Sequence, residues 1–291
     1  RTTLSIREIL GSGVDRPISS TPITVAEGGV FSLNTQSYLI STDDTFVKNK
    51  ANDGSVFQCA SSENVTSEIT RARVANNFAE IATIKLLDCD INLDDVTMEY
   101  NEAERETSGV FLLNSRLNVT NSRFLNQGRG GKGSAFVAAE LLSRVQLTDS
   151  RFWRGEGDLG GVVILVLAEE LRIERCNFEE NVANTAGVIH STGTDRVIIK
   201  SSNFVQNRAD RDISAIYISE SKGVEIFENA TFKGVNSNGV IRIEHTNTVA
   251  MRQVLFWGTL DSQVETVNVS ALIIDNMKTA QDEPGSLLKT K

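Results

Sequence analysis

The segment Leu171–Asn207 contains the same motif twice. Leu171-Arg-Ile-Glu-Arg-Cys-Asn-Phe-Glu-Glu-Asn181 is followed 26 residues later by Val197-Ile-Ile-Lys-Ser-Ser-Asn-Phe-Val-Gln-Asn207, and the small residues of Ala186-Gly-Val-Ile189 open a short apolar run between them. Self-similarity with a period of about 20 to 50 residues is the signature of a solenoid or another repeat architecture. The fold therefore depends on how far the motif recurs along the chain.

The phenylalanine of this motif has an equivalent in nearly every part of the sequence. Successive equivalents lie 24 to 28 residues apart, and an asparagine follows three residues later in five copies. Short apolar runs with a period of two lie before and after each equivalent, as expected for β-strands. The equivalent positions are Phe46, Val74, Met98, Phe124, Phe152, Phe178, Phe204, Phe232 and Phe256.

Three short strands in about 26 residues cannot bury a core within one repeat, whereas stacked repeats can. We therefore predict an all-β fold, a single parallel β-helix (a solenoid) of about nine coils with ~26 residues per coil. A β-propeller is the competing architecture, but its blades need about 40 residues or more. We expect an N-terminal cap over residues 1–27, the β-helix over 28–258, and an irregular C-terminal coil and tail over 259–291.

The repeats also resemble a known family. Phe-Glu-Glu-Asn181, Phe-Val-Gln-Asn207 and the openings Gly160-Gly-Val162 and Ala186-Gly-Val188 are similar to the FxxN and GGA[ILV] repeats of polymorphic outer-membrane proteins. The resemblance covers about residues 28–258, and FxxN is degraded in four copies, at Gln127, Gly155, Val235 and Thr259. The resemblance implies a single right-handed parallel β-helix and a surface-exposed adhesive or structural protein, whose motif residues build coils without carrying chemistry.

Composition narrows the function further. A net charge of −9 and a pI of about 4.9 argue against nucleic acid and anionic membranes as partners. The longest apolar stretch, Gly160–Ala168, is too short to span a membrane. The chain begins at Arg1 without a signal peptide, so we expect a processed product or a fragment. Four sequons permit N-glycosylation of a secreted protein, at Asn64, Asn118, Asn229 and Asn268.

Candidates for chemistry are weak, and we predict no catalytic, cofactor-binding or metal site. Asp43-Asp44 and Asp94-Asp95 lie two coils apart with Arg71 between them, which is more typical of alternating charges on a solvated corner than of a polysaccharide-cleaving site. Calcium could be drawn to Asp88, Asp90, Asp94 and Asp95, but this run does not follow a known calcium-binding pattern. The two histidines, His190 and His245, are isolated from each other and from catalytic partners.

The three cysteines are expected to be free thiols. Cys59 and Cys176 lie in inward-facing columns, as buried unreactive thiols do. Cys89 lies on the coil after Cys59, but about three residues out of lateral register with it. Because a disulfide requires closely spaced Cα atoms, that offset makes a bridge geometrically unfavourable.

The outer surface offers the most specific prediction. On three consecutive coils the residues expected to face solvent are apolar, and further apolar residues lie on the same coils. The predicted interface consists of Leu112, Val137, Ile164, Val166, Leu125 and Trp153. Outward apolar clusters mark covered surfaces or interfaces.

From these patterns we predict a non-enzymatic module that is extracellular or on the cell surface. It would be structural or adhesive, and a subunit of a surface filament is one form it could take. Its partners would be other protein subunits or surface proteins, self-assembly included, with glycans on the sequons. The alternative is a carbohydrate-active β-helix enzyme, either a polysaccharide lyase or a glycoside hydrolase.

Overall fold

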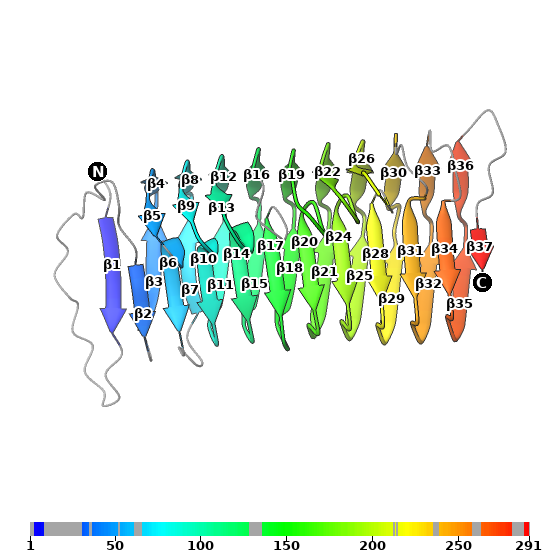
Figure 1. The fold of residues 1–291 in the computed structure, drawn as a ribbon, viewed down its shortest axis with the longest axis horizontal. Coiled ribbons are helices and arrows are strands. Elements are labelled where there is room, and N and C mark those ends of the chain that lie inside the picture. The colour runs from blue at the N-terminus through cyan, green and yellow to red at the C-terminus, as the bar shows by residue number, and fades with distance from the viewer. Residues whose placement is uncertain are drawn as a thin grey trace.

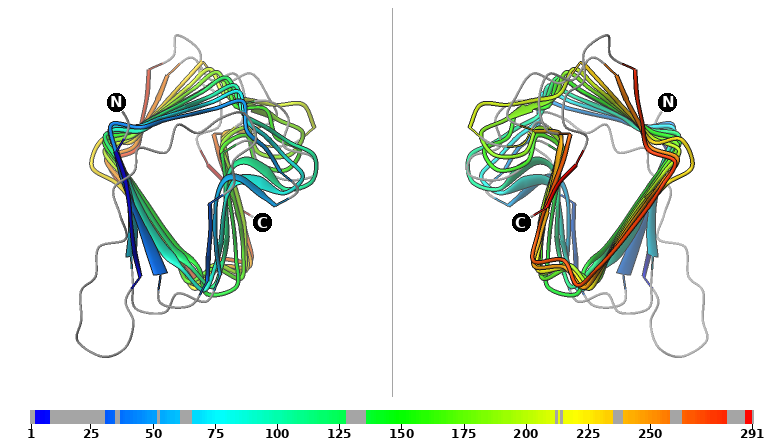
Figure 2. Two further views of the ribbon diagram at one scale, coloured as in Figure 1. Left: turned by 90° about the vertical axis from the view of Figure 1, so that its left-hand side faces the viewer. Right: turned by 90° about the vertical axis from the view of Figure 1, so that its right-hand side faces the viewer.

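The computed structural model describes residues 3–8, 31–34, 37–51, 53–60, 66–127, 136–211, 213, 215–234, 239–257, 263–280 and 288–290. These residues form β-strands and turns and no helix, and the strands stack along one axis (Figure 1). Seen from the N-terminal end, the chain turns clockwise as it recedes from the viewer (Figure 2, left). The predicted right-handed parallel β-helix with about 26 residues per coil is thereby confirmed.

Three long sheets form the walls of the β-helix. Sheet A contains β1 (Thr3–Glu8), β3 (Ser37–Thr42), β7 (Thr66–Thr70), β11 (Asp90–Asp94), β15 (Arg116–Thr120), β18 (Arg144–Thr148), β21 (Glu170–Glu174), β25 (Arg196–Lys200), β29 (Gly223–Phe227), β32 (Thr248–Arg252) and β35 (Ala271–Asp275). Sheet B contains β2 (Phe31–Asn34), β6 (Gly54–Ala60), β10 (Ala82–Leu87), β14 (Thr107–Leu113), β17 (Val137–Glu140), β20 (Val163–Val166), β24 (Ile189–Thr192), β28 (Ile216–Ser219), β31 (Ile241–Glu244), β34 (Val264–Val267) and β37 (Leu288–Thr290). Sheet C contains β4 (Thr45–Val47), β8 (Arg73–Ala75), β12 (Thr97–Glu99), β16 (Arg123–Leu125), β19 (Arg151–Trp153), β22 (Asn177–Glu179), β26 (Asn203–Val205), β30 (Thr231–Lys233), β33 (Leu255–Trp257) and β36 (Lys278–Ala280).

Each coil passes through sheet B, then sheet A, then sheet C, and a loop returns it to sheet B. These return loops project from one corner of the cross-section (Figure 2). Some of them carry short strands of two small sheets: β5 (Lys50–Ala51), β9 (Phe78–Ala79) and β13 (Glu102–Ala103) in one, β23 (Val182–Ala183) and β27 (Arg208–Ala209) in the other.

The two ends of the stack differ from the middle. At the N-terminal end, β1 pairs antiparallel with β3 and so lies across the edge of sheet A. The rest of the predicted cap, residues 1–2 and 9–27, lies outside the described residues. At the C-terminal end, β34 to β37 continue the three sheets in parallel register through the segment expected to be an irregular coil and tail. Sheet C accordingly contains ten strands, slightly more than the coil number expected from the sequence.

The core is a set of ladders of like residues. Phe124, Phe152, Phe178, Phe204, Phe232 and Phe256 are fully buried, and each stacks on the next with ring centroids 4.6–5.2 Å apart. The asparagine that follows the phenylalanine is also buried: Asn77 Nδ2 donates to Asn101 Oδ1 at 2.8 Å, and Asn181 Nδ2 donates to Asn207 Oδ1 at 2.9 Å. Residues that repeat in the sequence thus contact each other from coil to coil and form continuous columns in the interior.

The register of β14 differs from the one that the sequence predicts. Ala82 pairs with both Gly54 and Thr107, whereas Ile84 pairs with Phe57 and Val110, so β10 has one residue fewer here than the strand on either side. Val110, and not Phe111, therefore lies beside the inward-facing Ile84. The chain passes very close to the next coil here, because a Cβ on Gly109 would lie 2.0 Å from the carbonyl oxygen of Phe136. The inward and outward positions of β14 are therefore exchanged relative to the expected alternation.

The expectation of free thiols is wrong for two of the three cysteines. Cys59 and Cys89 form a disulfide with a Cα–Cα distance of 6.2 Å, and Cys176 is free and buried, as predicted. Lateral register places Leu86 beside Cys59, but the chain turns from sheet B to sheet A at Asp88. This corner brings Cys89 back toward the interior, so an offset counted along a straight strand does not apply.

Candidate functional site

The predicted interface residues do not form one surface. Leu112 and Val137 were expected to face solvent, and this is wrong: both are fully buried in the main core. Leu112 pairs with the inward-facing Leu86, and Val110 pairs with Val137, so the next strand continues the same register. The inward neighbour Phe136 makes edge-to-face contacts with two core rings and fixes this arrangement.

The outward apolar column of sheet B consists of different residues. Phe111, Ala138 and Ile164 lie in register on successive strands, and each is at least nine-tenths buried. Phe111 and Ala138 form a small outer cluster with Ala82, against which Ile81, Leu87 and Leu113 pack. This part of the outer face is therefore covered by the chain itself.

Leu125 and Trp153 lie on another face. They are paired in register on the outside of sheet C and are partly buried. Two guanidinium groups lie near the Trp153 ring, that of Arg154 at 4.2 Å from its centroid and that of Arg151 at 5.7 Å. Cation–π contacts of this kind leave little of the indole available for a protein partner.

The corner between sheets B and A carries an exposed apolar patch, which we call the leucine corner. It consists of Leu141, Leu142, Val166 and Leu167, with exposed fractions of 49%, 67%, 37% and 53%. The two pairs lie on adjacent coils, because Leu141 N donates to the Val166 carbonyl and Leu142 N to the Leu167 carbonyl. Of the six predicted interface residues, only Val166 belongs to this patch.

The backbone of the leucine corner is unfavourable for its residues. Leu141, Leu142 and Leu167 have φ values of 40°, 53° and 54°, in the left-handed region. On other coils this corner is occupied by residues that tolerate or suit that conformation in water: Asp88, Asn114, Gly193, Glu220, His245 and Asn268. A left-handed leucine costs roughly 1 kcal/mol, and its exposure forgoes the usual gain from burial. Leu141, Leu142, Val166 and Leu167 are visible as apolar residues in the sequence. Their exposure can be recognised only once it is known that these residues form the corner.

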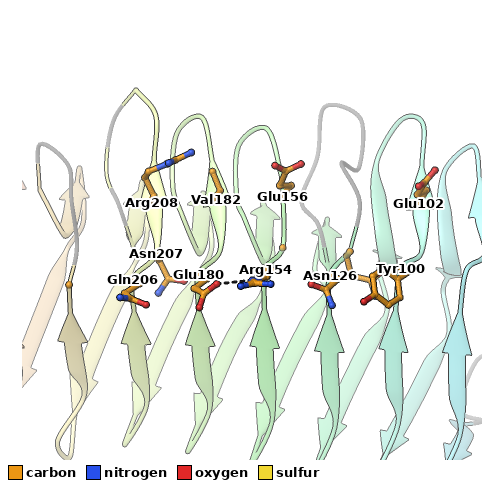
Figure 3. Close-up of a pocket in the computed structure, with 13 residues that line it drawn as sticks. Tyr100, Glu102, Asn126, Arg154, Glu156, Glu180, Val182, Gln206, Asn207 and Arg208 are labelled. Atoms are coloured by element: carbon orange, nitrogen blue, oxygen red, sulfur yellow. Dashed lines mark hydrogen bonds and ion pairs between the residues drawn. The ribbon is translucent and has the colours of Figure 1, made fainter.

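A second feature is a groove beneath the return loops, with a volume of about 850 Å³. Its floor is formed where the strands of sheet C end, and its wall is formed by the loops (Figure 3). The floor row contains Tyr100, Asn126, Arg154, Glu180, Gln206 and Gly234, and the wall row contains Glu102, Glu156, Val182 and Arg208. Between the rows lie Gln127, Gly155 and Asn207 of the asparagine column.

The groove lies where the asparagine column is interrupted. Gln127 and Gly155 replace asparagine on two successive coils, and the Gly155 N–H donates to Asn181 Oδ1 at 2.9 Å. Gln127 is 2% exposed, and its Oε1 has no hydrogen-bond partner among the residues that the structure describes. At the centre of the floor, Arg154 Nε donates to Glu180 Oε2 at 2.7 Å and holds the pKa of that carboxyl below its usual range.

The acidic residues that were candidates for a polysaccharide-cleaving site each interact with a different partner. Arg71 makes a two-pronged contact with Asp43 at 2.7 and 2.8 Å, which lowers the pKa of that carboxyl. Asp44 is buried instead, and burial raises its pKa although Ser41 Oγ donates to it at 2.5 Å. Asp94 accepts hydrogen bonds from Thr120 and Asn121.

The expected calcium ligands do not converge. Asp88 accepts a hydrogen bond from Asn114, and Asp90 accepts one from the Arg116 N–H on the next coil. Among the residues that the structure describes, no three His, Cys, Asp or Glu side chains are grouped as a metal site would require.

Three of the four sequons can be located. Asn118, Asn229 and Asn268 are exposed, and Asn64 lies outside the described residues. Asn118 is in the middle of β15, where its Nδ2 donates to Asn92 Oδ1 at 2.8 Å, whereas Asn229 and Asn268 lie at corners. Glycosylation at these positions stays a prediction.

In the described part of the chain there is no helix of the length and hydropathy needed to span a membrane. No protein-family model, no curated protein and no solved structure matches this chain.

Proposed function

We propose that this chain is a non-enzymatic structural or adhesive β-helix module of an extracellular or cell-surface protein, and that it joins copies of itself through the leucine corner. The observation that carries the proposal is the placement of three exposed leucines in left-handed backbone. A left-handed backbone is unfavourable for leucine, and so is exposure of its side chain to water. An interface that buries these side chains would explain why leucine occupies these positions.

Two further features support the extracellular placement and the structural role. Disulfides persist mainly in oxidising compartments, and Cys59–Cys89 fits that environment. The resemblance of the FxxN repeats to those of polymorphic outer-membrane proteins points the same way. In addition, the surface carboxyls of Asp43, Asp149, Glu169 and Glu180 have pKa values lowered by arginines on adjacent coils, which is unfavourable for a general acid.

The proposal is tested by the assembly state of the purified chain and of the double variant Leu142→Asn/Leu167→Asn. We expect the natural chain to self-associate with rising concentration in sedimentation velocity, and the double variant to remain monomeric. Because asparagine tolerates left-handed backbone, the variant should also be more stable to unfolding, by about 1 kcal/mol.

The matched control is Leu159→Asn, which removes a leucine of 40% exposure from a return loop outside the corner. It should assemble as the natural chain does. A natural chain that is monomeric up to concentrations of about 100 µM, or a double variant that assembles normally, contradicts self-association through this corner.

The competing function is a carbohydrate-active enzyme, and the long groove is the observation in its favour. It is tested by incubating the purified chain with acidic polysaccharides and measuring the release of new chain ends. Turnover that Glu102→Gln or Glu156→Gln in the groove abolishes would replace the structural proposal.

A further inference from the structure

The groove is built for an extended ligand. Its floor row runs from Tyr100 to Gly234 over six successive coils. Since adjacent coils lie about 4.8 Å apart, the row is roughly 24 Å long, which suits a chain molecule laid along the helix axis better than a compact metabolite. Figure 3 shows the floor and wall side chains as two rows on either side of this path.

The groove offers side chains to a ligand, since the backbone N–H groups of its floor are already paired. The N–H groups of Tyr100, Asn126, Arg154, Glu180 and Gln206 each donate to a carbonyl of the next coil. An extended peptide is usually recognised by adding a strand to a free sheet edge, and the floor has no such edge. Recognition here must therefore use side-chain carboxylates, amides and guanidinium groups, which pair well with hydroxyl groups.

The charges of the lining have both signs. Glu102, Glu156 and Glu180 are set against Arg154 and Arg208, and these arginines contact Glu180 at 2.7 Å and Asp210 at 3.0 Å. A polymer with one charge per unit would meet repulsion on several coils, whichever its sign. An uncharged polymer rich in hydroxyl groups meets donors and acceptors on every coil without that penalty.

An aromatic side chain adds to this match. Tyr100 is 53% exposed at one end of the floor and offers an aromatic face on which a sugar ring can stack.

We infer that the groove binds a neutral glycan chain, laid along the helix axis from Tyr100 toward Gln206. Tyr100 stacks on a sugar ring, and Glu102, Glu156, Asn126 and Gln206 contact hydroxyl groups. This adds a carbohydrate ligand to the proposed adhesive role, and it does not depend on assembly through the leucine corner.

The experiment titrates the full chain with neutral hexasaccharides and follows binding by calorimetry. The probes are cellohexaose, xylohexaose, mannohexaose and laminarihexaose, with hexagalacturonate as the acidic comparison. We expect at least one neutral hexasaccharide to bind, with weaker or no binding of hexagalacturonate. Tyr100→Ala should weaken the binding about five- to tenfold, whereas Trp257→Ala, which removes a 51% exposed aromatic outside the groove, should not change it.

A second readout locates the ligand. In Trp257→Phe the only remaining indole is Trp153, whose ring contacts the Arg154 guanidinium on the groove floor. Binding should therefore change the fluorescence of Trp153.

The inference is overturned if no neutral hexasaccharide binds, if hexagalacturonate binds more tightly than all of them, or if Tyr100→Ala folds and binds unchanged. The Leu142→Asn/Leu167→Asn variant should bind the glycan as the natural chain does, so failure of self-association and failure of glycan binding are read separately.

Discussion

At the residue scale, the chemistry of each cysteine is set by its place on the coil. Cys59 faces inward from β6, and Cys89 faces inward from the next corner, so the two thiols meet. Cys176 is 1% exposed in a column where neighbouring coils carry Ser150 and Ser202, and burial raises the pKa of its thiol to about 12. Only Cys59 and Cys89 can therefore cross-link the chain, and the Cys176 thiol is unreactive while the protein is folded.

We predict that replacing both bridged cysteines, as Cys59→Ala/Cys89→Ala, lowers the free energy of unfolding by about 2–4 kcal/mol. The disulfide closes a loop of 30 residues in sequence separation, which restricts the unfolded chain. Chemical denaturation measures the change, and peptide mapping without reductant detects the bridge. Cys176→Ser is the control and should change stability little, since serine occupies the same column on adjacent coils. Three thiols that react in the native protein would contradict the assignment.

At the element scale, the internal ladders hold one coil on the next. Asn181 makes buried hydrogen bonds to three partners: its Oδ1 accepts from the Gly155 N–H, and its Nδ2 donates to the Phe152 carbonyl and to Asn207 Oδ1. The exposed pair on the outside of sheet C looks similar, with Asn203 Nδ2 donating to Asn177 Oδ1 at 2.8 Å. Burial distinguishes them, because water replaces a lost exposed bond and cannot replace a buried one.

We predict that Asn181→Ala lowers the free energy of unfolding by about 2–4 kcal/mol, because it leaves the Gly155 N–H and the Phe152 carbonyl unsatisfied in the interior. Asn203→Ala, the matched exposed substitution, should change it by less than about 0.5 kcal/mol. Urea denaturation of the two variants provides the comparison. Equal effects would show that the buried column is not what joins the coils.

At the scale of the whole molecule, ion pairs run between coils over the surface. Arg71–Asp43, Arg175–Asp149, Arg144–Glu169 and Arg154–Glu180 each join neighbouring coils. All are exposed, so each contributes little, and their effect is collective. The arginines lower the pKa of each carboxyl, which means that the folded state binds protons less readily than the unfolded state.

The sign of the resulting pH dependence follows from that shift. A carboxyl with a lowered folded pKa adds stability above its unfolded pKa, and loses it as the pH falls through the folded value. We therefore predict that the melting temperature is steady from about pH 7 to 5 and falls as the pH drops below about 4. Calorimetry at low salt measures this, and about 1 M NaCl should weaken the dependence by screening the pairs. A melting temperature that is unchanged at pH 3 would contradict a role for these pairs.

The sequence by itself determined the repeat, its length and the inward columns. Each coil places equivalent residues directly above those of the coil before it. The spacing of equivalent residues along the sequence therefore predicts which side chains touch, as it does for Phe178 with Phe204 and for Asn181 with Asn207. The same spacing predicted the three-sided parallel architecture. It also placed Cys176 correctly, since its column continues unchanged through adjacent coils.

Only the tertiary structure decided where the pattern departs from a straight count. The pairing of Val110, and not Phe111, with Ile84 placed Leu112 and Val137 inward, and the corner at Asp88 brought Cys89 to Cys59. Likewise, the exposure of Leu142 and Leu167 depends on a left-handed corner, and the groove depends on loops of unequal length projecting from successive coils. The positions of bulges, corners and loops depend on how the backbones of adjacent coils pack against each other. The repeat period of the sequence does not specify that packing.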